Sequence, residues 1–145
     1  TMDYGAMVDG YCSDMTKTVV IGKADDEMKK LYNTVLTAQK AAIDYIKEGV
    51  LCRDCDKVAR DIIHGAGYEG RFGHSLGHGV GMFIHEEPRL ASSWDKPLEV
   101  GAIVTVEPGI YIEGKYACRI EDMLAITEDG CYNFAHSPKE LIELF

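Results

Sequence analysis

The chain has 145 residues, of which 46% are hydrophobic, which suffices for one domain with a buried core but not for two sizeable ones. Acidic side chains outnumber basic ones by 24 to 15, and a net charge of −9 argues against a nucleic-acid-binding surface, which needs clustered Lys and Arg. No apolar run is long enough for a membrane span, and an odd count of five cysteines favours a reducing compartment, so we expect a cytoplasmic protein that binds neither nucleic acid nor membrane.

The first predicted element is a β-hairpin at the start of the chain. Asp9-Gly10 is a strong signal for a two-residue turn, and the segment from Tyr11 to Ile21 that follows is rich in β-branched residues. Such a turn pairs Val8 with Tyr11. The register of every residue further from the turn is then fixed by counting along the two strands.

Two aspartates fall on one face of this hairpin. The register pairs Asp3 with Thr16, which makes Asp14 the diagonal neighbour of Asp3. Diagonal neighbours lie about 7–8 Å apart, and less between the tips of their side chains. We therefore expect both carboxylates to lie within reach of a shared metal pair.

Two amphipathic helices are predicted next. The first begins at Asp25-Asp26 and ends at Gly49, and its apolar face comprises Met28, Leu31, Val35, Ala38, Ala42, Tyr45 and Ile46. The second spans residues 54–65, with Val58, Ala59, Ile62 and Ile63 buried. Cys52 and Cys55 precede it in a C-x-x-C pattern. Because no second pair of cysteines exists, we interpret them as incidental thiols rather than a zinc or redox site.

A glycine-rich segment, residues 70–81, is predicted to form a loop with short strands at a functional site. It contains five glycines together with His74 and His78, and His85 follows shortly after. Arg89 stands where a zinc protease of the His-Glu-x-x-His type would need its second histidine, so that class is excluded. The next stretch, through Pro88 and Pro97, is predicted to be a loop.

A second hairpin is predicted towards the end of the chain. If the turn is the three-residue loop Glu113-Gly114-Lys115, Ile112 pairs with Tyr116 and Glu107 lies directly opposite Glu121. Two facing carboxylates repel unless a cation lies between them. For either hairpin alone, acids on a solvent-facing side remain the alternative. Two acidic pairs beside a histidine loop favour a metal site.

Four motifs in this order resemble the aminopeptidase P and prolidase branch of the creatinase-like, or pita-bread, metallopeptidases. They are DYGAMVDGYCSDMTKT at 3–18, HSLGHGVGMFIHE at 74–86, VEPGIY at 106–111 and RIED at 119–122. The resemblance implies an α+β fold in which helices flank a curved antiparallel sheet, with residues 1–145 as one catalytic domain. It also implies that part of the first half-domain would precede Thr1, so we expect an N-terminally truncated, C-terminal catalytic part of that fold.

The resemblance further implies two divalent metal ions. Their ligands would be Asp3, Asp14, His78, Glu107 and Glu121. Of these, Asp14 and Glu121 would bridge the two ions. Oxygen donors with one imidazole suit Mn²⁺, which is our expectation, and Co²⁺ and Zn²⁺ are the alternatives.

The implied reaction is attack by a hydroxide that bridges the ions on a peptide bond preceding proline. Glu107 would handle the proton of the attacking water, while His74 and His85 would contact the substrate. Arg119 would lie behind the ligands and offset their negative charge.

The implied substrates are peptides with proline at the second position, either dipeptides or longer chains, and the full-length protein is expected to be a homodimer. Two other functions stay open: a methionine aminopeptidase, which shares the ligands, and a non-catalytic binding protein on the same scaffold. Whether the chain is active by itself also stays open.

Overall fold

The structure, a computed structural model, describes residues 1–145. Its helices are α1 (Asp26–Tyr45) and α2 (Cys52–Gly65). Its strands are β1 (Met2–Tyr4), β2 (Met7–Val8), β3 (Tyr11–Cys12), β4 (Met15–Lys17), β5 (Val19–Ile21), β6 (Gly77–Gly79), β7 (Glu86–Leu90), β8 (Ile103–Val106), β9 (Gly109–Ile112), β10 (Tyr116–Arg119), β11 (Asp122–Ile126), β12 (Cys131–Asn133) and β13 (Ile142–Leu144).

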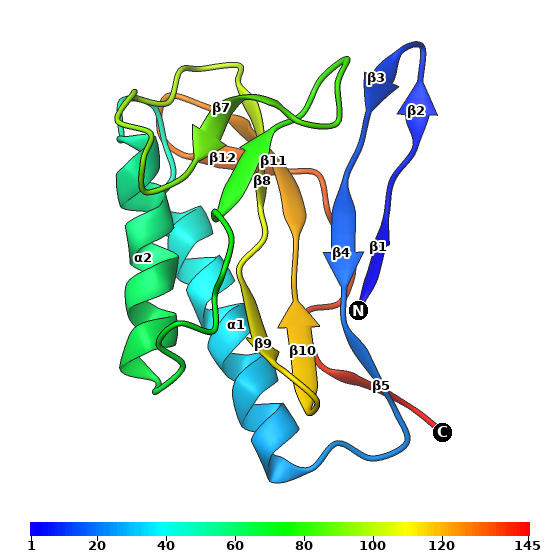
Figure 1. Cartoon of the computed structure of the whole chain (residues 1–145). Helices are drawn as coiled ribbons and strands as arrows, with labels where there is room; N and C mark the ends of the chain where they lie inside the picture. The colour runs from blue at the N-terminus through cyan, green and yellow to red at the C-terminus, as the bar shows by residue number, and fades with distance from the viewer.

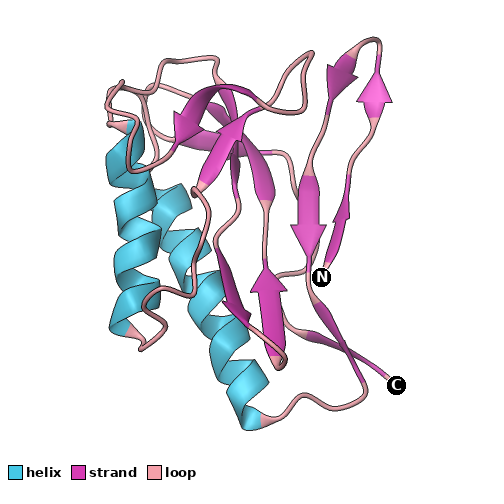
Figure 2. Ribbon diagram, viewed as in Figure 1, coloured by secondary structure: helices cyan, strands magenta, loops and turns pink.

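The elements form layers. The two helices lie side by side and cover one side of the central strands, and the long hairpin of β1 to β4 stands on the other side (Figure 1). The main sheet is antiparallel, with the strand order β12-β11-β8-β6-β7, and the ribbon in Figure 2 shows how the helices cover it. Apolar side chains of both helices and of these strands form one continuous core. Neither helix is long and apolar enough to cross a membrane.

Helix α1 begins where the sequence predicts. Asp25 is its N-cap, and the Asp25 side chain accepts a hydrogen bond of 2.8 Å from the backbone N–H of Met28. The predicted end at Gly49 is wrong, because the chain turns to an extended conformation at Ile46. Tyr45 is also wrongly placed in the core, since it is 39% exposed.

Helix α2 begins two residues earlier than predicted, so Cys52 and Cys55 lie on the helix and are fully buried. Burial raises the pKa of the Cys52 thiol to about 11 and that of Cys55 to about 12. Both remain protonated apolar core residues at neutral pH, as expected of incidental thiols.

Both predicted hairpin registers are confirmed. Val8 pairs with Tyr11 and Asp3 pairs with Thr16, and the turn residues Asp9 and Gly10 have positive φ angles of 50° and 85°. The predicted strand from Tyr11 to Ile21 is, however, broken into β3, β4 and β5.

In the second hairpin, Ile112 pairs with Tyr116 around Gly114, whose φ angle is 70°. Strands β8 and β11 continue the same register beyond β9 and β10, because Asp122 pairs with Val106. Glu107 and Glu121 therefore face each other at the point where the two pairs of strands meet.

The prediction of a loop through Pro88 is wrong, because residues 86–90 form strand β7 against β6. Two glycines of β6 allow this close pairing. A Cβ atom on Gly77 would lie 1.9 Å from the carbonyl oxygen of Thr105, and one on Gly79 would lie 2.3 Å from that of Glu87. The strand carrying His78 is thus wedged between its two neighbours, which fixes the position of this histidine.

Candidate metal centre

A bridge between the two hairpins assembles the site. The backbone N–H of Glu121 donates to the carbonyl oxygen of Thr16 at 3.0 Å, and the Thr16 hydroxyl donates to Glu121 Oε2 at 2.6 Å. Thr16 is fully buried. The first hairpin is thereby joined to the second, and Asp14, two residues before Thr16, is brought beside Glu121.

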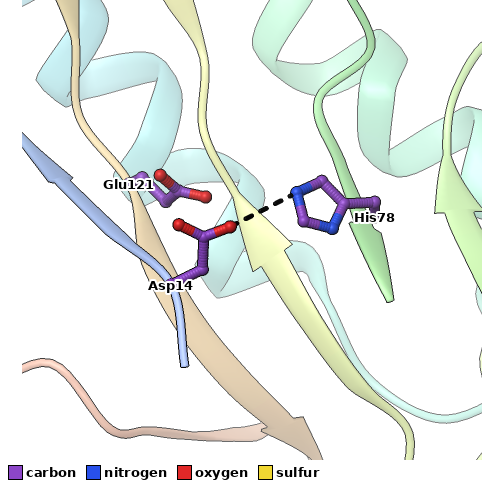
Figure 3. A group of neighbouring side chains, drawn as sticks. All are labelled: Asp14, His78 and Glu121. Atoms are coloured by element: carbon purple, nitrogen blue, oxygen red, sulfur yellow. Dashed lines mark ion pairs between the residues drawn. The ribbon is translucent and has the colours of Figure 1, made fainter. Parts of the chain in front are cut away.

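Three predicted ligands converge from three separate parts of the chain. Asp14, His78 and Glu121 each offer a ligand atom, and these atoms all lie within 4.8 Å of one another. Figure 3 shows the three side chains pointing toward one another, His78 from β6, Asp14 from between β3 and β4, and Glu121 from between β10 and β11. This spacing suits donors that share a cation.

The fourth predicted ligand, Glu107, touches the same imidazole. Glu107 Oε1 lies 3.1 Å from His78 Nε2, and Asp14 Oδ2 lies 3.7 Å from the same nitrogen. His78 Nδ1 is 3.0 Å from the carbonyl oxygen of Gly79. Since a carbonyl can only accept, Nδ1 carries a proton, and Nε2 faces the carboxylate oxygens. Burial lowers the pKa of His78, but its contacts with Glu107 and Gly79 and the charge of Asp14 outweigh burial and raise it. Without a metal, a proton on Nε2 thus compensates part of the acidic charge, and a metal ion bound there would replace that proton.

The pKa values of the acids express the same deficit. Burial, together with the charges of Glu107 and Asp14, raises the pKa of Glu121 to about 8. The pKa of Asp14 is also raised, by burial and then by the charge of Asp3. Burial acts on Glu107 in the same direction, but its contacts with His78 and Thr105 outweigh it and lower the pKa of Glu107. Without a cation, Glu121 and Asp14 therefore ionise less readily than ordinary carboxyl groups.

Asp3, the fifth predicted ligand, lies at the rim. Its side chain is 56% exposed and forms an ion pair with Arg119. Arg119 Nε is also 3.8 Å from Glu107 Oε2 and donates to the Thr16 hydroxyl at 3.3 Å. The Arg119 guanidinium thus lies beside Asp3 and Glu107, where it can offset the negative charge of the predicted ligands.

The sequence profile of metallopeptidase family M24 matches residues 1–128. The chain belongs to this family. An Xaa-Pro dipeptidase of Lactobacillus delbrueckii subsp. lactis is 48% identical over 139 residues, which are 96% of this chain and 38% of the relative. The peptidase YqhT of Bacillus subtilis, described as uncharacterized, is also 48% identical, over 99% of this chain and 41% of its own length. The chain therefore spans about two fifths of these relatives.

Solved structures give the same result for the fold. An Xaa-Pro dipeptidase from Bacillus anthracis superposes with a TM-score of 0.96 at 49% identity, and an X-Pro aminopeptidase from Thermotoga maritima with a TM-score of 0.95 at 42% identity. Each match covers 98% of this chain and 40% of the solved chain. The expected pita-bread α+β fold of the M24 peptidases is confirmed.

An open pocket of about 380 Å³ lies against the acids of this M24 chain. Its lining consists of polar side chains only, namely His74, Ser75, His78, His85, Arg89, Glu107 and Arg119. Both histidines predicted to contact the substrate are among them. The exposed His85 ring stands edge-on to His78, with 4.3 Å between the ring centres. Five of the predicted site residues thus line the pocket, and the other three lie outside its lining: Asp14 beside His78, Asp3 beside Arg119 and Glu121 beside Thr16.

Three residues near the site were missed from the sequence. Tyr111 lies with its hydroxyl 2.8 Å from His74 Nε2, and Thr16 joins the hairpins. Arg89 lines the pocket because it pairs with His78 across β6 and β7. The signal for Thr16 was its register opposite Asp3. The Pro88 beside Arg89 concealed the strand, and Tyr111 stood in the VEPGIY motif without a role being assigned to it.

Proposed function

We propose that the protein hydrolyses peptide bonds that precede proline, with residues 1–145 as its catalytic domain and two divalent ions held by Asp3, Asp14, His78, Glu107 and Glu121. The observation that carries the proposal is the convergence of Asp14, His78 and Glu121 within 4.8 Å, with Glu107 3.1 Å from the same imidazole. When bound, the ions would acidify a water molecule and polarise the scissile carbonyl. Mn²⁺ is the proposed metal because oxygen donors dominate the set.

The side chains around the pocket have separate tasks in this proposal. Glu107 has a pKa below its usual range and is therefore a carboxylate at neutral pH, ready to accept the proton of the attacking water. The same proton can then pass to the departing prolyl nitrogen. His74 and His85 both line the pocket, where they would contact the substrate, and the exposed His85 ring would offer an imidazole N–H to the developing negative charge.

His74 is held in a defined tautomer. Its Nδ1 is 2.9 Å from the carbonyl oxygen of Ser75, so Nδ1 carries a proton and Nε2 accepts from the Tyr111 hydroxyl. Arg119 Nη1 lies 3.5 Å from that hydroxyl. The cation, the phenol and the imidazole thus form a chain that supports His74 in a fixed orientation.

The preference for proline rests on the relatives that carry this activity in their names, at 42–49% identity. Because those relatives are much longer than this chain, the substrate and the activity of the whole protein are part of the proposal. A cytoplasmic location, suggested by the odd cysteine count, and a homodimeric full-length protein are carried forward as further parts of it.

The test has two stages. The full-length protein is stripped with a chelator and titrated with Mn²⁺ by calorimetry, and we expect two ions per chain. Turnover of Ala-Pro and of Met-Ala is then compared with the metal present. Hydrolysis of Ala-Pro alone supports the proposal, preference for Met-Ala indicates a methionine aminopeptidase, and metal binding without any turnover indicates a binding protein.

A further inference from the structure

Helix α2 carries a buried ion pair that the proposed chemistry does not use. Asp56 and Arg60, one helical turn apart, meet through two parallel hydrogen bonds of 2.8 and 2.9 Å. The Asp56 side chain is 1% exposed and that of Arg60 is 25% exposed. Removing two charges from water costs free energy, and a buried ion pair stabilises a fold little more than apolar packing would. Its role is therefore better judged from the other hydrogen bonds that the two side chains form. We call this pair the α2 clamp.

The remaining hydrogen bonds of the α2 clamp all go to one short segment. Arg60 Nη1 donates to the carbonyl oxygen of Phe72 and Arg60 Nη2 to that of His74, both at 2.8 Å. Asp56 Oδ1 accepts from the backbone N–H of Leu76 at 3.0 Å. The segment 71–76 belongs to no helix or strand, so the clamp supplies the backbone partners that a neighbouring strand would otherwise give.

The segment held in this way leads directly into the pocket. The Arg60 guanidinium stacks on the Phe72 ring at 4.3 Å, and the Phe72 ring meets the His74 ring edge-on at 5.0 Å. Leu76 is held from both ends, because its N–H bonds to Asp56 and its carbonyl oxygen accepts from the backbone N–H of Glu107 at 2.8 Å. The clamp is therefore connected to both His74 and Glu107 through short contacts.

We propose that the α2 clamp is a positioning device that sets His74 and Glu107 at their working separation in the pocket. Asp56 and Arg60 do not line the pocket, so they act on it only through the segment they hold. This inference rests on the proposed function for its kinetic consequence. Its structural consequence, the fixed orientation of His74, is independent of that function.

The test uses Arg60→Lys in the full-length protein. Lysine keeps the charge but cannot form the planar fork, so it cannot hold Asp56, Phe72 and His74 at once. The matched control is Lys57→Gln, because Lys57 forms the same one-turn pair with Asp61 on the same helix but is 67% exposed and touches no part of the loop. Thermal unfolding of each variant provides the folded fraction by which activities are corrected.

We expect Arg60→Lys to lower kcat for an Xaa-Pro dipeptide by about ten- to a hundred-fold, with KM and Mn²⁺ stoichiometry unchanged, because loss of an outer support has effects of this size. The ring ¹⁵N shifts of His74 should move, while those of the exposed His136 stay in place. Lys57→Gln should change none of these quantities.

Unchanged kcat and unchanged His74 shifts in Arg60→Lys would overturn the proposal. A loss of kcat that only follows the folded fraction, with His74 shifts unchanged, would reduce the pair to a structural role and overturn it as well. If the unmodified protein hydrolyses no Xaa-Pro substrate, the proposed function fails, and the His74 shifts in Arg60→Lys still decide whether the clamp positions this ring.

Discussion

In the metal-free protein, Glu121→Gln should increase stability at alkaline pH. The pKa of Glu121 is raised from 4.5 to about 8 by burial and by the neighbouring acids. An acid with a raised pKa binds its proton more tightly in the folded state. Its contribution is therefore complete below the ordinary pKa and is lost as the pH rises toward about 8. The neutral amide of glutamine has no such loss.

The size of the effect follows from the two pKa values. Each pKa unit corresponds to about 1.4 kcal/mol, so ionisation of Glu121 should cost the folded state roughly 3 kcal/mol between about pH 5 and about pH 8. The assay is urea unfolding of chelated protein at both pH values, followed by the fluorescence of Trp94, the single tryptophan. The quantity compared is the difference in unfolding free energy between variant and unmodified protein.

We expect the two proteins to be nearly equal at the acidic pH and the variant to be more stable by a few kcal/mol at the alkaline pH. Glu128→Gln, at an exposed acid, is the control and should show no such change. Equal differences at both pH values would refute the reasoning that the acidic cluster is strained without a cation. The same variant should bind Mn²⁺ poorly. The carboxylate that destabilises the metal-free protein would then be the one that metal binding requires.

Three further outcomes are expected. Glu107→Ala should abolish turnover mainly by loss of metal rather than by unfolding, as measured by metal analysis and thermal unfolding; full metal content with normal turnover would contradict this. Gly77→Ala should prevent formation of the site or of the fold, because its Cβ would meet the Thr105 carbonyl oxygen at 1.9 Å, and circular dichroism with Mn²⁺ titration would detect either result. Asp25→Ala should cost about 1 kcal/mol in urea unfolding, since the N-cap bond to Met28 is lost; an unchanged midpoint would count against it.

Local turn chemistry explains why the sequence predicted so much of the site. The residues of the Asp9-Gly10 turn and Gly114 in the second turn adopt positive φ angles, which few other residues tolerate, and each turn sets the register of its hairpin. Asp3 opposite Thr16 and Glu107 opposite Glu121 then follow by counting. The two acidic pairs beside the histidine loop already favoured a metal site, while the assignment of the individual ligands came from the family resemblance and remains a proposal.

What the sequence did not predict depends on contacts between distant segments. Strand β7 contains Pro88, and proline argues against a strand when only the neighbouring sequence is considered. The strand forms because Gly77 and Gly79 of β6 leave room for the pairing. Strand β13 pairs in parallel with β5, and the sequence alone gave no sign of this partner. The contacts of Arg60 with the segment 72–74 likewise join a helix to a loop, and no periodic pattern records them.

The bridge between Thr16 and Glu121 joins residues 105 positions apart in the chain. Closing so long a loop costs entropy that is recovered only when both hairpins have formed and met, so we expect this contact to form late in folding. During synthesis, Asp14 emerges from the ribosome long before Glu121. With the proposed ligands, a chain that is incomplete or misfolded in either hairpin would present single acids rather than a chelating group, and high-affinity loading with metal would be reserved for molecules that have finished folding.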